Sequence, residues 1–463
     1  MSVTALEETL NEDARARALQ EVVALMREYD VKHVYLQYTS VPGRVMGKVI
    51  PARHFERVAD GGLPWTYLSA GGFTTTLAGD VIGPAAATLT EGLLIPDLST
   101  FQVLPWDTDM ARVICDHFHR PDDPERPGQI ALGDTRAHLK QLHREFQQEL
   151  GLELKSGCEP EMSWFPSRDA IEAVAQLPEN VGSAYHIGHL EEMREILKRV
   201  TQYGQALGLD MIQADYEDPG QIEMNFSYGS CVETADRLTT YRQICKQVAR
   251  EFGVYATFMP KPVPGIMANG CHHHLSLWRG EESAIENPGG RDINDLGRWA
   301  IGGLLAHARG MSAIVAPTVN SYARYWDVGL FAPSVPIWGY DDRQCIVRVL
   351  GNRAEYRAPD ASCNPYLSHA VILAALRDGI VNRIEPGEPH AEEAEARVED
   401  ARFPLLPRTL GEAIDAFEAD AAISGTLPSD IRDTFLAIKR DEWHRACGVV
   451  TEWHRAMYLD YLP

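Results

Sequence analysis

The chain has 463 residues, which is enough for two to four domains, or for one large domain with an appendage. Hydrophobic residues make up 45% and charged residues 24% of the sequence, a composition that excludes disorder as the main state. The 43 basic and 66 acidic residues give a formal net charge of −23, and this acidic field disfavours nucleic acid and anionic membranes as partners.

The N-terminal part of the chain has the pattern of a small mixed domain. Apolar residues at spacings of three and four predict an amphipathic helix over residues 11–29. Strand-like runs follow at 31–37, 45–50 and 110–115, and Gly and Pro residues separate them. The polar, Pro-rich stretch 120–128 then predicts a domain boundary.

Two compositional features bear on the compartment. No apolar run reaches the roughly 18 residues of a membrane span, and residues 1–28 lack the hydrophobic stretch of a secretory signal, so we expect a cytoplasmic protein. The eight cysteines include no Cys-x-x-Cys pair, which argues against a disulfide framework and a zinc knuckle. We expect most of them to be buried, reduced thiols.

Beyond residue 128 the pattern is that of a larger α+β domain. Helical patterns at 134–150 and 189–207 alternate with strand-like runs. In the run 155–165, alternation places Glu159 and Glu161 on one face, and the flanking apolar residues indicate packing on the other. Two carboxylates that face one way indicate a bound cation.

A second acidic run, residues 215–225, is predicted as another strand. It again brings carboxylates close together, namely those of Asp215, Glu217 and Glu223.

Three consecutive histidines, His272, His273 and His274, precede a hydrophobic strand-like run. Alternation puts His272 and His274 on one face and His273 on the other. A lone histidine is most often a satisfied core residue, but three in a row after a glycine favour ligand or phosphate contacts. Carboxylates combined with one imidazole are typical of Mg²⁺ or Mn²⁺ sites rather than of zinc sites.

Five arginines fall between residues 324 and 357 of this otherwise acidic chain. Guanidinium groups match the geometry of phosphate and carboxylate, so the concentration indicates bound anions. A strand would place Arg353, Glu355 and Arg357 on one face. Acid clusters for a divalent metal beside arginines for phosphate predict a phosphoryl-transfer site. The five arginines are Arg324, Arg343, Arg348, Arg353 and Arg357.

With these motifs, most of the chain resembles the glutamine synthetase superfamily. Five segments match the family's motifs in the family's order: Glu159-Pro-Glu161, Pro219-Gly-Gln-Ile-Glu223, the Lys-Pro loop 257–262 with Gly270-Cys-His-His-His274, Asn320-Ser-Tyr-Ala-Arg324, and Arg353-Ala-Glu-Tyr-Arg-Ala-Pro-Asp360. The resemblance implies a small N-terminal β-grasp domain over roughly residues 15–118. It also implies a catalytic domain over 128–463, an antiparallel sheet with flanking helices.

The resemblance also implies roles for the matched residues. The expected ligands of the metal on the glutamate side are Glu161, Glu217 and Glu223, and those of the metal on the ATP side are Glu159, His272 and Glu355. Asp215 stays open as an alternative to Glu217, because the family's acid stands at a slightly different spacing. The expected ATP contacts are His274, Arg343, Arg348 and Arg353. Arg324 and Arg357 are expected to bind L-glutamate, and together with Arg343 and Asp327 they form the expected catalytic set. Mg²⁺ or Mn²⁺ is the expected cofactor, with ATP as a co-substrate.

Two departures from the family's pattern bear on the amine substrate. Members that make glutamine carry an Asp-Gly-Ser-Ser segment whose aspartate helps to bind ammonium, but Leu68 stands in the corresponding stretch, and residues 61–79 contain no acid. Those members also carry a flap glutamate before an Ala-Pro pair, where this chain has Phe331. An ammonium ion loses its counter-charge in such a site, whereas an amine with an apolar body gains contact area. Leu68 and Phe331 are therefore the predicted amine pocket. For five nearby aromatic residues two interpretations stay open, an extension of this pocket or ordinary core packing: Trp65, Tyr67, Phe73, Trp326 and Trp338.

The sequence thus predicts an ATP-dependent ligase that joins the γ-carboxylate of L-glutamate to an alkyl- or arylamine through γ-glutamyl phosphate. Two alternatives stay open. One is an ammonia-using glutamine synthetase in which Asp327 replaces the flap acid, and the other is a catalytically inactive regulatory homologue. The resemblance further implies a homo-oligomer, with a dodecamer expected, in which one subunit's N-terminal domain completes the next subunit's site. Residues 382–403 contain no tyrosine, so control by adenylylation is expected to be absent.

Overall fold

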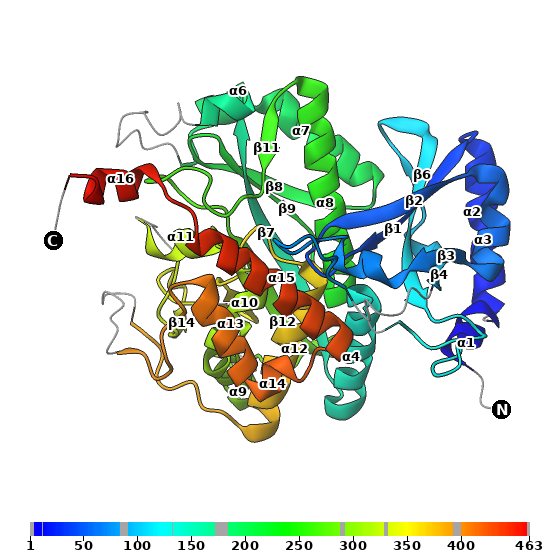
Figure 1. Cartoon of the computed structure of the whole chain (residues 1–463). Helices are drawn as coiled ribbons and strands as arrows, with labels where there is room; N and C mark the ends of the chain where they lie inside the picture. The colour runs from blue at the N-terminus through cyan, green and yellow to red at the C-terminus, as the bar shows by residue number, and fades with distance from the viewer. Residues whose placement is uncertain are drawn as a thin grey trace.

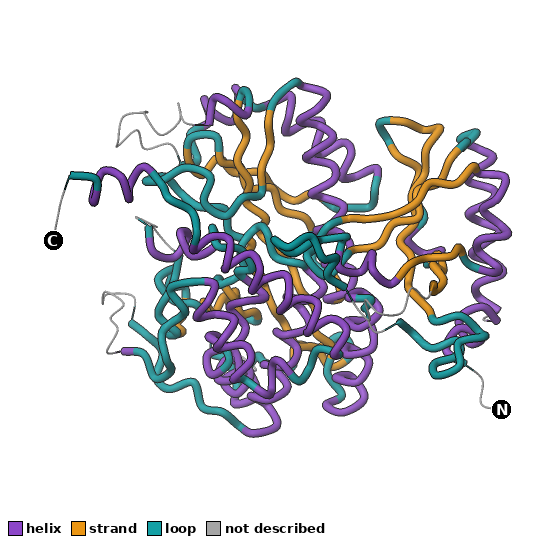
Figure 2. Tube along the Cα trace, viewed as in Figure 1, coloured by secondary structure: helices purple, strands orange, loops and turns teal. Residues whose placement is uncertain are grey.

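The computed structural model describes residues 4–11, 13–83, 91–131, 133–171, 184–287, 292–327, 332–391 and 400–460. Its strands form two separate sheets, one of six strands near the N-terminus and one of ten strands in the rest of the chain. Figure 1 shows the small sheet with its helices on one side of the molecule, and Figure 2 shows the strands of the large sheet enclosed by helices. The predicted α+β class is confirmed.

The N-terminal sheet has the order β2-β1-β6-β4-β3, with β5 also paired to β6. The pair β1 and β6 is parallel, and the other pairs are antiparallel. On β1, Val34 and Leu36 are buried in a core that contains Val22 of α2 and Phe55 of α3, so these helices cover that face. The strands are β1 His33–Thr39, β2 Val45–Pro51, β3 Leu63–Thr66, β4 Glu91–Pro96, β5 Gln102–Leu104 and β6 Asp107–Phe118.

The large sheet has the order β14-β15-β16-β12-β7-β9-β8. As predicted for the catalytic region it is antiparallel, apart from the pair β14 and β15. Three short strands pair with its centre, β10 and β11 with β7, and β13 with β12. The strands are β7 Glu153–Phe165, β8 Met211–Asp218, β9 Gln221–Phe226, β10 Gly229–Ser230, β11 Tyr255–Thr257, β12 Cys271–Arg279, β13 Glu282–Ser283, β14 Trp338–Tyr340, β15 Val347–Leu350 and β16 Arg353–Tyr356.

Helix α12 is the centre of the largest hydrophobic core, and its buried residues lie all around its axis. Gly379 of α12 and Gly303 of α9 let the two helices cross closely, because a Cβ on either glycine would lie within 3.0 Å of the partner's backbone. The described helices are α1 Ala5–Asn11, α2 Asp13–Glu28, α3 Phe55–Gly61, α4 Thr135–Leu150, α6 Ile187–Glu192, α7 Arg194–Ala206, α8 Cys231–Phe252, α9 Asp295–Ala306, α10 Ala308–Val315, α11 Ser321–Trp326, α12 Pro365–Asn382, α13 Leu410–Ala419, α14 Ala421–Ser424, α15 Ser429–Cys447 and α16 Glu452–Tyr458. Within the described ranges, none of these helices has the length and apolar character needed to cross a membrane.

Two predicted elements differ from the structure. The run 215–225 is not one strand, because Pro219 and Gly220 turn the chain and separate β8 from β9 as a hairpin. Gly220 has φ 76°, a backbone conformation that favours glycine. The single helix predicted at 189–207 is divided into α6 and α7, with Met193 between them.

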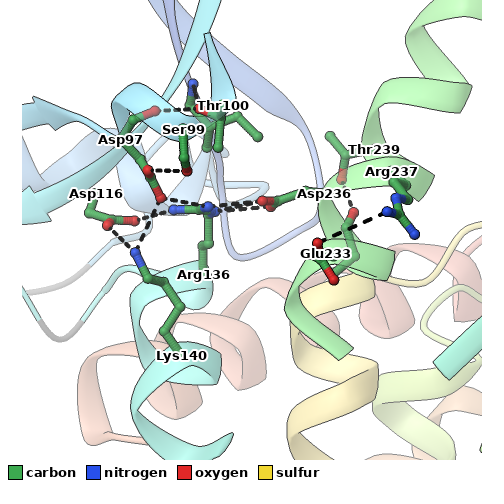
Figure 3. Close-up of polar contacts among 12 residues, drawn as sticks. Asp97, Ser99, Thr100, Asp116, Arg136, Lys140, Glu233, Asp236, Arg237 and Thr239 are labelled. Carbon is green, nitrogen blue, oxygen red and sulfur yellow. Dashed lines mark hydrogen bonds and ion pairs between the residues drawn. The ribbon is translucent and has the colours of Figure 1, made fainter. Parts of the chain in front are cut away.

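A buried ionic network joins the N-terminal sheet to helices α4 and α8 (Figure 3). Arg136 of α4 lies 2.9 Å from Asp97, 2.7 Å from Asp116 and 2.9 Å from Asp236, so it contacts the N-terminal sheet and α8 together. Lys140, one turn later on α4, pairs with Asp116 at 2.7 Å. The predicted domain bounds, 15–118 and 128–463, stay predictions, but this network shows that the two parts pack tightly.

Candidate active site

The register of four strands brings the predicted acids and imidazoles together. His272 of β12 lies directly opposite Glu159 of β7, and Glu161 lies opposite Glu223 of β9. Asp215 of β8 continues this row, opposite Glu223. Because directly opposed residues in a sheet point to the same face, the row forms one polar surface.

The three histidines alternate as predicted. His272 and His274 face the acids, whereas His273 Nε2 lies 2.9 Å from Ser368 Oγ of α12 on the opposite face. The predicted face of β16 is also observed, because Glu355 turns toward His272 while Ala354 and Tyr356 belong to the hydrophobic core.

His272 lies at the centre of the site. Its Nδ1 is 3.4 Å from Glu159 Oε2 and 3.2 Å from Glu355 Oε1, and its Nε2 is 3.8 Å from Glu161 Oε1. Burial and the charge of Arg357 lower the pKa of His272, but its bonds to Glu159 and Glu355 outweigh them and leave that pKa above its ordinary value. The surroundings therefore favour a positive charge at this position.

His274 is a second imidazole partner of Glu159. Its Nε2 lies 2.6 Å from Glu159 Oε1, and its Nδ1 accepts a hydrogen bond from Arg353 Nε at 3.1 Å. Donor atoms of Glu159, His274 and Glu355 lie within 4.8 Å of one another. Both imidazoles are thus within reach of the ATP-side metal position, for which the resemblance implied His272 alone.

The carboxylates at the other end of the row lack a compensating charge. Burial and the charges of Glu159 and Glu161 raise the pKa of Glu223 well above its ordinary value. Burial, Glu161 and Asp215 raise the pKa of Glu217 in the same way. Unneutralised carboxylates that repel one another are the environment that a divalent cation stabilises.

Both alternative acids of β8 reach this surface. The register between β8 and β9 shifts between Tyr216 and Asp218, so Glu217 occupies an irregularity of the strand. Burial, Glu161 and Asp215 raise the pKa of Glu217 while Arg343 lowers it. The pKa of Asp215 responds chiefly to its own burial, to Gln213 and to Glu159. This grouping favours Glu217 as the partner of Glu161 and Glu223.

Glu161 is oriented by neutral donors. Its Oε2 accepts from the Gly270 amide at 2.7 Å and from Gln221 Nε2 at 3.1 Å. Gln221 also contacts Asn269, which ties β9 to the loop before β12.

The arginines contribute the opposing charge. Arg324 is 2% exposed, and it donates to the carbonyls of Ala358 and Arg357 while its Nη2 lies 3.3 Å from His272 Nε2. Arg348 Nη1 donates to Glu355 Oε2 at 3.0 Å, and Arg357 donates to the other oxygen of the same carboxylate.

Two cavities meet at Glu159. The acidic cavity, of 300 Å³, holds most predicted site residues and is lined by Glu159, Glu161, Ala184, Tyr185, Gln213, Asp215, Glu217, Gln221, Glu223, Met267, Ala268, His272, Arg324, Ala332, Arg343, Arg348 and Arg357. The aromatic cavity, of 430 Å³, shares Glu159 and Gln213 with it and is also lined by Gly157, Cys158, Ile212, Asn225, Phe226, Tyr228, His274, Ser276, Trp278, Asn352 and Arg353. The predicted ATP contacts are thus divided between adjoining cavities.

The predicted amine pocket of Leu68 and Phe331 stays a prediction, because only one of the two residues is described. Leu68 lies in a short 3₁₀ turn, η2 (Tyr67–Gly71), which packs against α15, and it is absent from the described lining of the acidic cavity. Phe331 lies outside the described residues, although Ala332, which follows it, lines the acidic cavity.

Asp327, the predicted base, does not line the acidic cavity as the structure describes it. Its Oδ2 lies 3.1 Å from Lys261 Nζ and accepts a hydrogen bond from the Gly265 amide at 2.9 Å.

Of the aromatic residues considered for the pocket, three are buried: Trp65, Tyr67 and Trp338. Phe73 is 51% exposed and Trp326 37% exposed, so these two side chains are accessible to another molecule.

Three contributors were missed by sequence reasoning. Tyr185 lines the acidic cavity together with Arg343 and Glu217 and affects the pKa of Glu217, and no motif marks it. Trp278 and Tyr228 line the aromatic cavity. Alternation along β12 could have identified Trp278, because it shares a face with His274 and Ser276.

The chain matches known proteins along nearly its whole length. A profile for the catalytic domain of glutamine synthetase matches residues 132–458. The glutamine synthetase of Methanocaldococcus jannaschii is 31% identical, over 96% of this chain and 98% of that protein. The glutamate–methylamine ligase of Methyloversatilis universalis is 30% identical, over 95% of this chain and 99% of that protein. A solved structure of GmaS in complex with ADP has a TM-score of 0.84 and 29% identity, with 95% of this chain and 99% of that chain covered.

Proposed function

The chain belongs to the glutamine synthetase family, and from this premise we propose that it joins the γ-carboxylate of L-glutamate to an organic amine in an ATP-dependent reaction. The observation that carries the choice of amine is the absence of acid from residues 61–79, together with Phe331 before Ala332-Pro333. A desolvated ammonium ion needs carboxylate partners, and these two positions offer hydrocarbon instead. The likeness to a glutamate–methylamine ligase supports the same choice.

The donor set fits divalent metal ions. Glu161, Glu217 and Glu223 would hold one ion, and Glu159, Glu355 and an imidazole of β12 would hold the other. All of these are oxygen or nitrogen donors. The raised pKa values of Glu217 and Glu223 indicate carboxylates whose negative charge a bound cation would stabilise. Bound Mg²⁺ or Mn²⁺ supplies charge neutralisation for phosphoryl transfer.

The nucleotide is proposed to occupy the aromatic cavity. Trp278 and Tyr228 offer ring faces for the base, while His274 and Arg353 lie on the side toward Glu159. The phosphate chain then points from the aromatic cavity into the acidic cavity, where Arg343 and Arg348 stand.

L-Glutamate is proposed to bind in the acidic cavity. Arg324 and Arg357 bring two guanidinium groups to its wall, and each is held in place by a carbonyl or carboxylate partner. Fixed cations beside the reacting carboxylate stabilise the charge that develops as its oxygen attacks the γ-phosphorus of ATP. The products of this first step are γ-glutamyl phosphate and ADP.

The second step is attack by the neutral amine on the γ-carbonyl of the acyl phosphate, with release of phosphate. Asp327 is engaged by Lys261 and Gly265, so we propose that the amine arrives as its free base rather than being deprotonated by Asp327. Alkylamines titrate near lysine, at about 10.4, so their free fraction rises steeply with pH above neutrality.

An amine panel tests the proposal. Purified protein is incubated with ATP, Mg²⁺, L-glutamate and either ammonia, methylamine, a longer alkylamine or aniline, and the products are identified by mass spectrometry. We expect kcat/KM for an organic amine to exceed that for ammonia at least tenfold. The variant Arg324→Gln is the control for contaminating host enzyme and should be inactive.

The panel also tests the alternatives. Preferred formation of glutamine would identify an ammonia-using synthetase, and absence of product with every amine would identify an inactive homologue. Either result would refute the proposal.

A further inference from the structure

A groove on another part of the molecule separates the N-terminal sheet from helix α8. It has a volume of 490 Å³, and its lining residues are Tyr35, Gln37, Gly43, Val45, Leu104, Trp106, Thr239, Arg242, Gln243, Lys246, Gln247 and Arg250. We call it the basic groove. It shares no described lining residue with the acidic or the aromatic cavity.

The groove has one wall from each part of the fold. Tyr35 and Gln37 of β1 alternate with the core residues Val34 and Leu36, so they point away from α2 and toward α8. Figure 1 shows β1 on the side of the N-terminal sheet that faces α8.

The wall formed by α8 is a stripe of cations. Arg242, Lys246 and Arg250 are spaced four residues apart, so they lie one above another on a single face of the helix. The buried residues Tyr241, Cys245 and Val248 form the opposite, core-facing side. Like charges at this spacing repel one another, so the stripe weakens the helix unless something neutralises it.

No carboxylate in the described part of the chain neutralises this stripe. None of the three cations forms an ion pair with a described residue, and the lining of the groove contains neither Asp nor Glu. This absence is notable in a chain with 66 acidic and only 43 basic residues.

The partners that these cations do have are neutral. Arg242 Nη1 donates to the Cys363 carbonyl at 2.9 Å, Lys246 donates to the Ala256 carbonyl, and Arg250 donates to Gln247. The Nε of Arg242 is buried and has no hydrogen-bond partner among the described residues. Each of the three side chains has further N–H groups beyond these bonds.

We propose that the basic groove binds a small, multiply charged anion through phosphate or carboxylate groups. Three cationic residues line a cavity of this size and provide the charge, and guanidinium donors match both kinds of group. The acidic surface of the protein repels anions in general, so binding depends on this local stripe.

Protection of Lys246 from acetylation tests the proposal in the unmodified protein. Metal-free protein in 0.15 M salt is treated with acetic anhydride, with inorganic pyrophosphate, citrate or neither present, and the rate at each lysine is read by peptide mass spectrometry. We expect pyrophosphate or citrate to slow the acetylation of Lys246 at least fivefold. Lys198, 68% exposed and distant from the groove in sequence, is the internal control and should react at an unchanged rate.

The two probes separate the sources of the charge. Protection by pyrophosphate alone assigns a phosphate ligand, and protection by citrate alone assigns a carboxylate ligand. No protection by either probe at about 10 mM refutes the proposal, as does equal protection of Lys198, because a diffuse attraction acts on all exposed lysines and is screened within about 8 Å at this salt.

Calorimetric titration of variants provides a second test. The pair Lys246→Gln and Arg250→Gln should weaken pyrophosphate binding at least tenfold. The matched control, Arg17→Gln with Arg57→Gln, makes the same change in net charge on exposed helices that cover the other face of the N-terminal sheet. Equal affinity in both double variants would place all binding at the catalytic arginines and overturn the inference.

Discussion

Glu223 and Glu355 lie in one site but in opposite electrostatic environments. Glu223 is surrounded by carboxylates, which together with burial raise its pKa, whereas bonds and charges from His272 and Arg357 outweigh burial and lower that of Glu355. A carboxylate without a counter-charge destabilises the metal-free fold, and a paired one stabilises it. Neutral substitutions at the two positions should therefore have opposite effects.

We expect Glu223→Gln to stabilise the metal-free protein by about 1 kcal/mol, because one pKa unit corresponds to about 1.4 kcal/mol and the repulsion is removed. The amide can keep the hydrogen bond that Asn225 donates to Oε1. In thermal melts, Tm in EDTA should rise, while the increase in Tm on adding Mg²⁺ should shrink. A lower Tm in EDTA would contradict the assignment.

Glu355→Gln is the matched comparison and should lower Tm in EDTA. It leaves Arg348, Arg357 and His272 without their shared counter-charge in a fully buried position, which costs about 3–5 kcal/mol when a buried pair is broken. An unchanged Tm would show that water reaches and solvates this cluster.

Phe331→Glu tests the apolar amine site. A restored carboxylate should raise kcat/KM for ammonia and lower it for a long alkylamine, because the site regains a counter-charge and loses hydrocarbon. In the unmodified protein, alkylamine turnover should rise between about pH 7 and 9 as the free-base fraction grows, and arylamine turnover should change much less. A flat alkylamine profile, or no gain in ammonia use by the variant, would contradict the prediction.

At the scale of residues, chemistry that follows strand alternation could be predicted from the sequence. The opposite faces of His272 and His273 are an example, since a period of two determines them. Tyr185 could not be predicted, because it reaches Glu217 and Arg343 from a segment that is distant from both along the chain. The environment of Asp327 was missed for the same reason, since Lys261 is its partner only through the fold.

At the scale of elements, Arg136 of α4 connects the N-terminal sheet to α8. The pKa values of Asp97 and Asp116 are lowered, because the charges of Arg136 and Lys140 outweigh burial. Acids whose pKa is lower in the folded than in the unfolded chain stabilise the fold above their unfolded pKa of about 3.9, and this stability is lost as the pH falls through the folded values.

Arg136→Gln should therefore destabilise the protein most at neutral pH. Three carboxylates lose their central cation, and breaking such a buried cluster costs about 3–5 kcal/mol at pH 7. The loss should shrink only below about pH 4, as the pH falls from the unfolded pKa of Asp toward the lowered folded pKa values of Asp97 and Asp116. Urea unfolding of both proteins at pH 7 and at about pH 3 measures the difference.

Arg120→Gln provides the control for that experiment. Arg120 pairs with Asp122, and both side chains are largely exposed, so its loss should leave stability almost unchanged at either pH. Equal losses for the two variants would show that the Arg136 network is no stronger than a surface pair.

Element types were predicted better than element boundaries. Strand β7 and helix α4 follow from strong alternation and from an Asp134 cap that accepts two backbone N–H groups. The hairpin of β8 and β9 was missed because acidic residues continue across its turn, although Pro219 and Gly220 are turn residues. The continuous acidic pattern thus led to one predicted strand, although the turn residues Pro219 and Gly220 indicate two.

At the scale of the whole molecule, apolar residues are exposed near the C-terminus. Val449, Val450, Trp453, Tyr458 and Leu459 are each at least 57% exposed, and Figure 1 shows α16 at the edge of the molecule. Large exposed apolar groups of this kind mark association surfaces. Leu68 also lies away from the acidic cavity of its own chain, as expected if N-terminal residues serve a neighbouring subunit.

We therefore expect a homo-oligomer that depends on this segment. Ending the chain after Cys447 should lower the mass measured by light scattering, because the exposed apolar groups are removed. The substitution Val381→Ser, at an exposed position of α12, is a control that should leave the mass unchanged. A monomeric full-length chain would contradict the prediction.

The overall architecture could be predicted because its motifs occur in a characteristic order, whereas assembly depends on surfaces that have no motif. Trp453 is exposed and Trp338 is buried, but the apolar pattern of the sequence does not distinguish the two residues. The three-dimensional structure is needed to distinguish an apolar residue in the core from one that is exposed and available for association.

The three adjacent imidazoles of β12 also affect how the chain folds. A strand that slips by one residue exchanges its two faces, and hydrophobic patterning normally penalises that error. Here a slip would still present an imidazole beside Glu159, so the histidines alone cannot specify the correct pairing. His273 resolves the ambiguity, because its ring stacks on His369 with 4.6 Å between centroids and hydrogen-bonds Ser368. His273, which faces away from the acidic residues, thus fixes the register of β12. Its replacement by valine should lower the yield of folded protein, while the fraction that folds correctly keeps its kinetic constants.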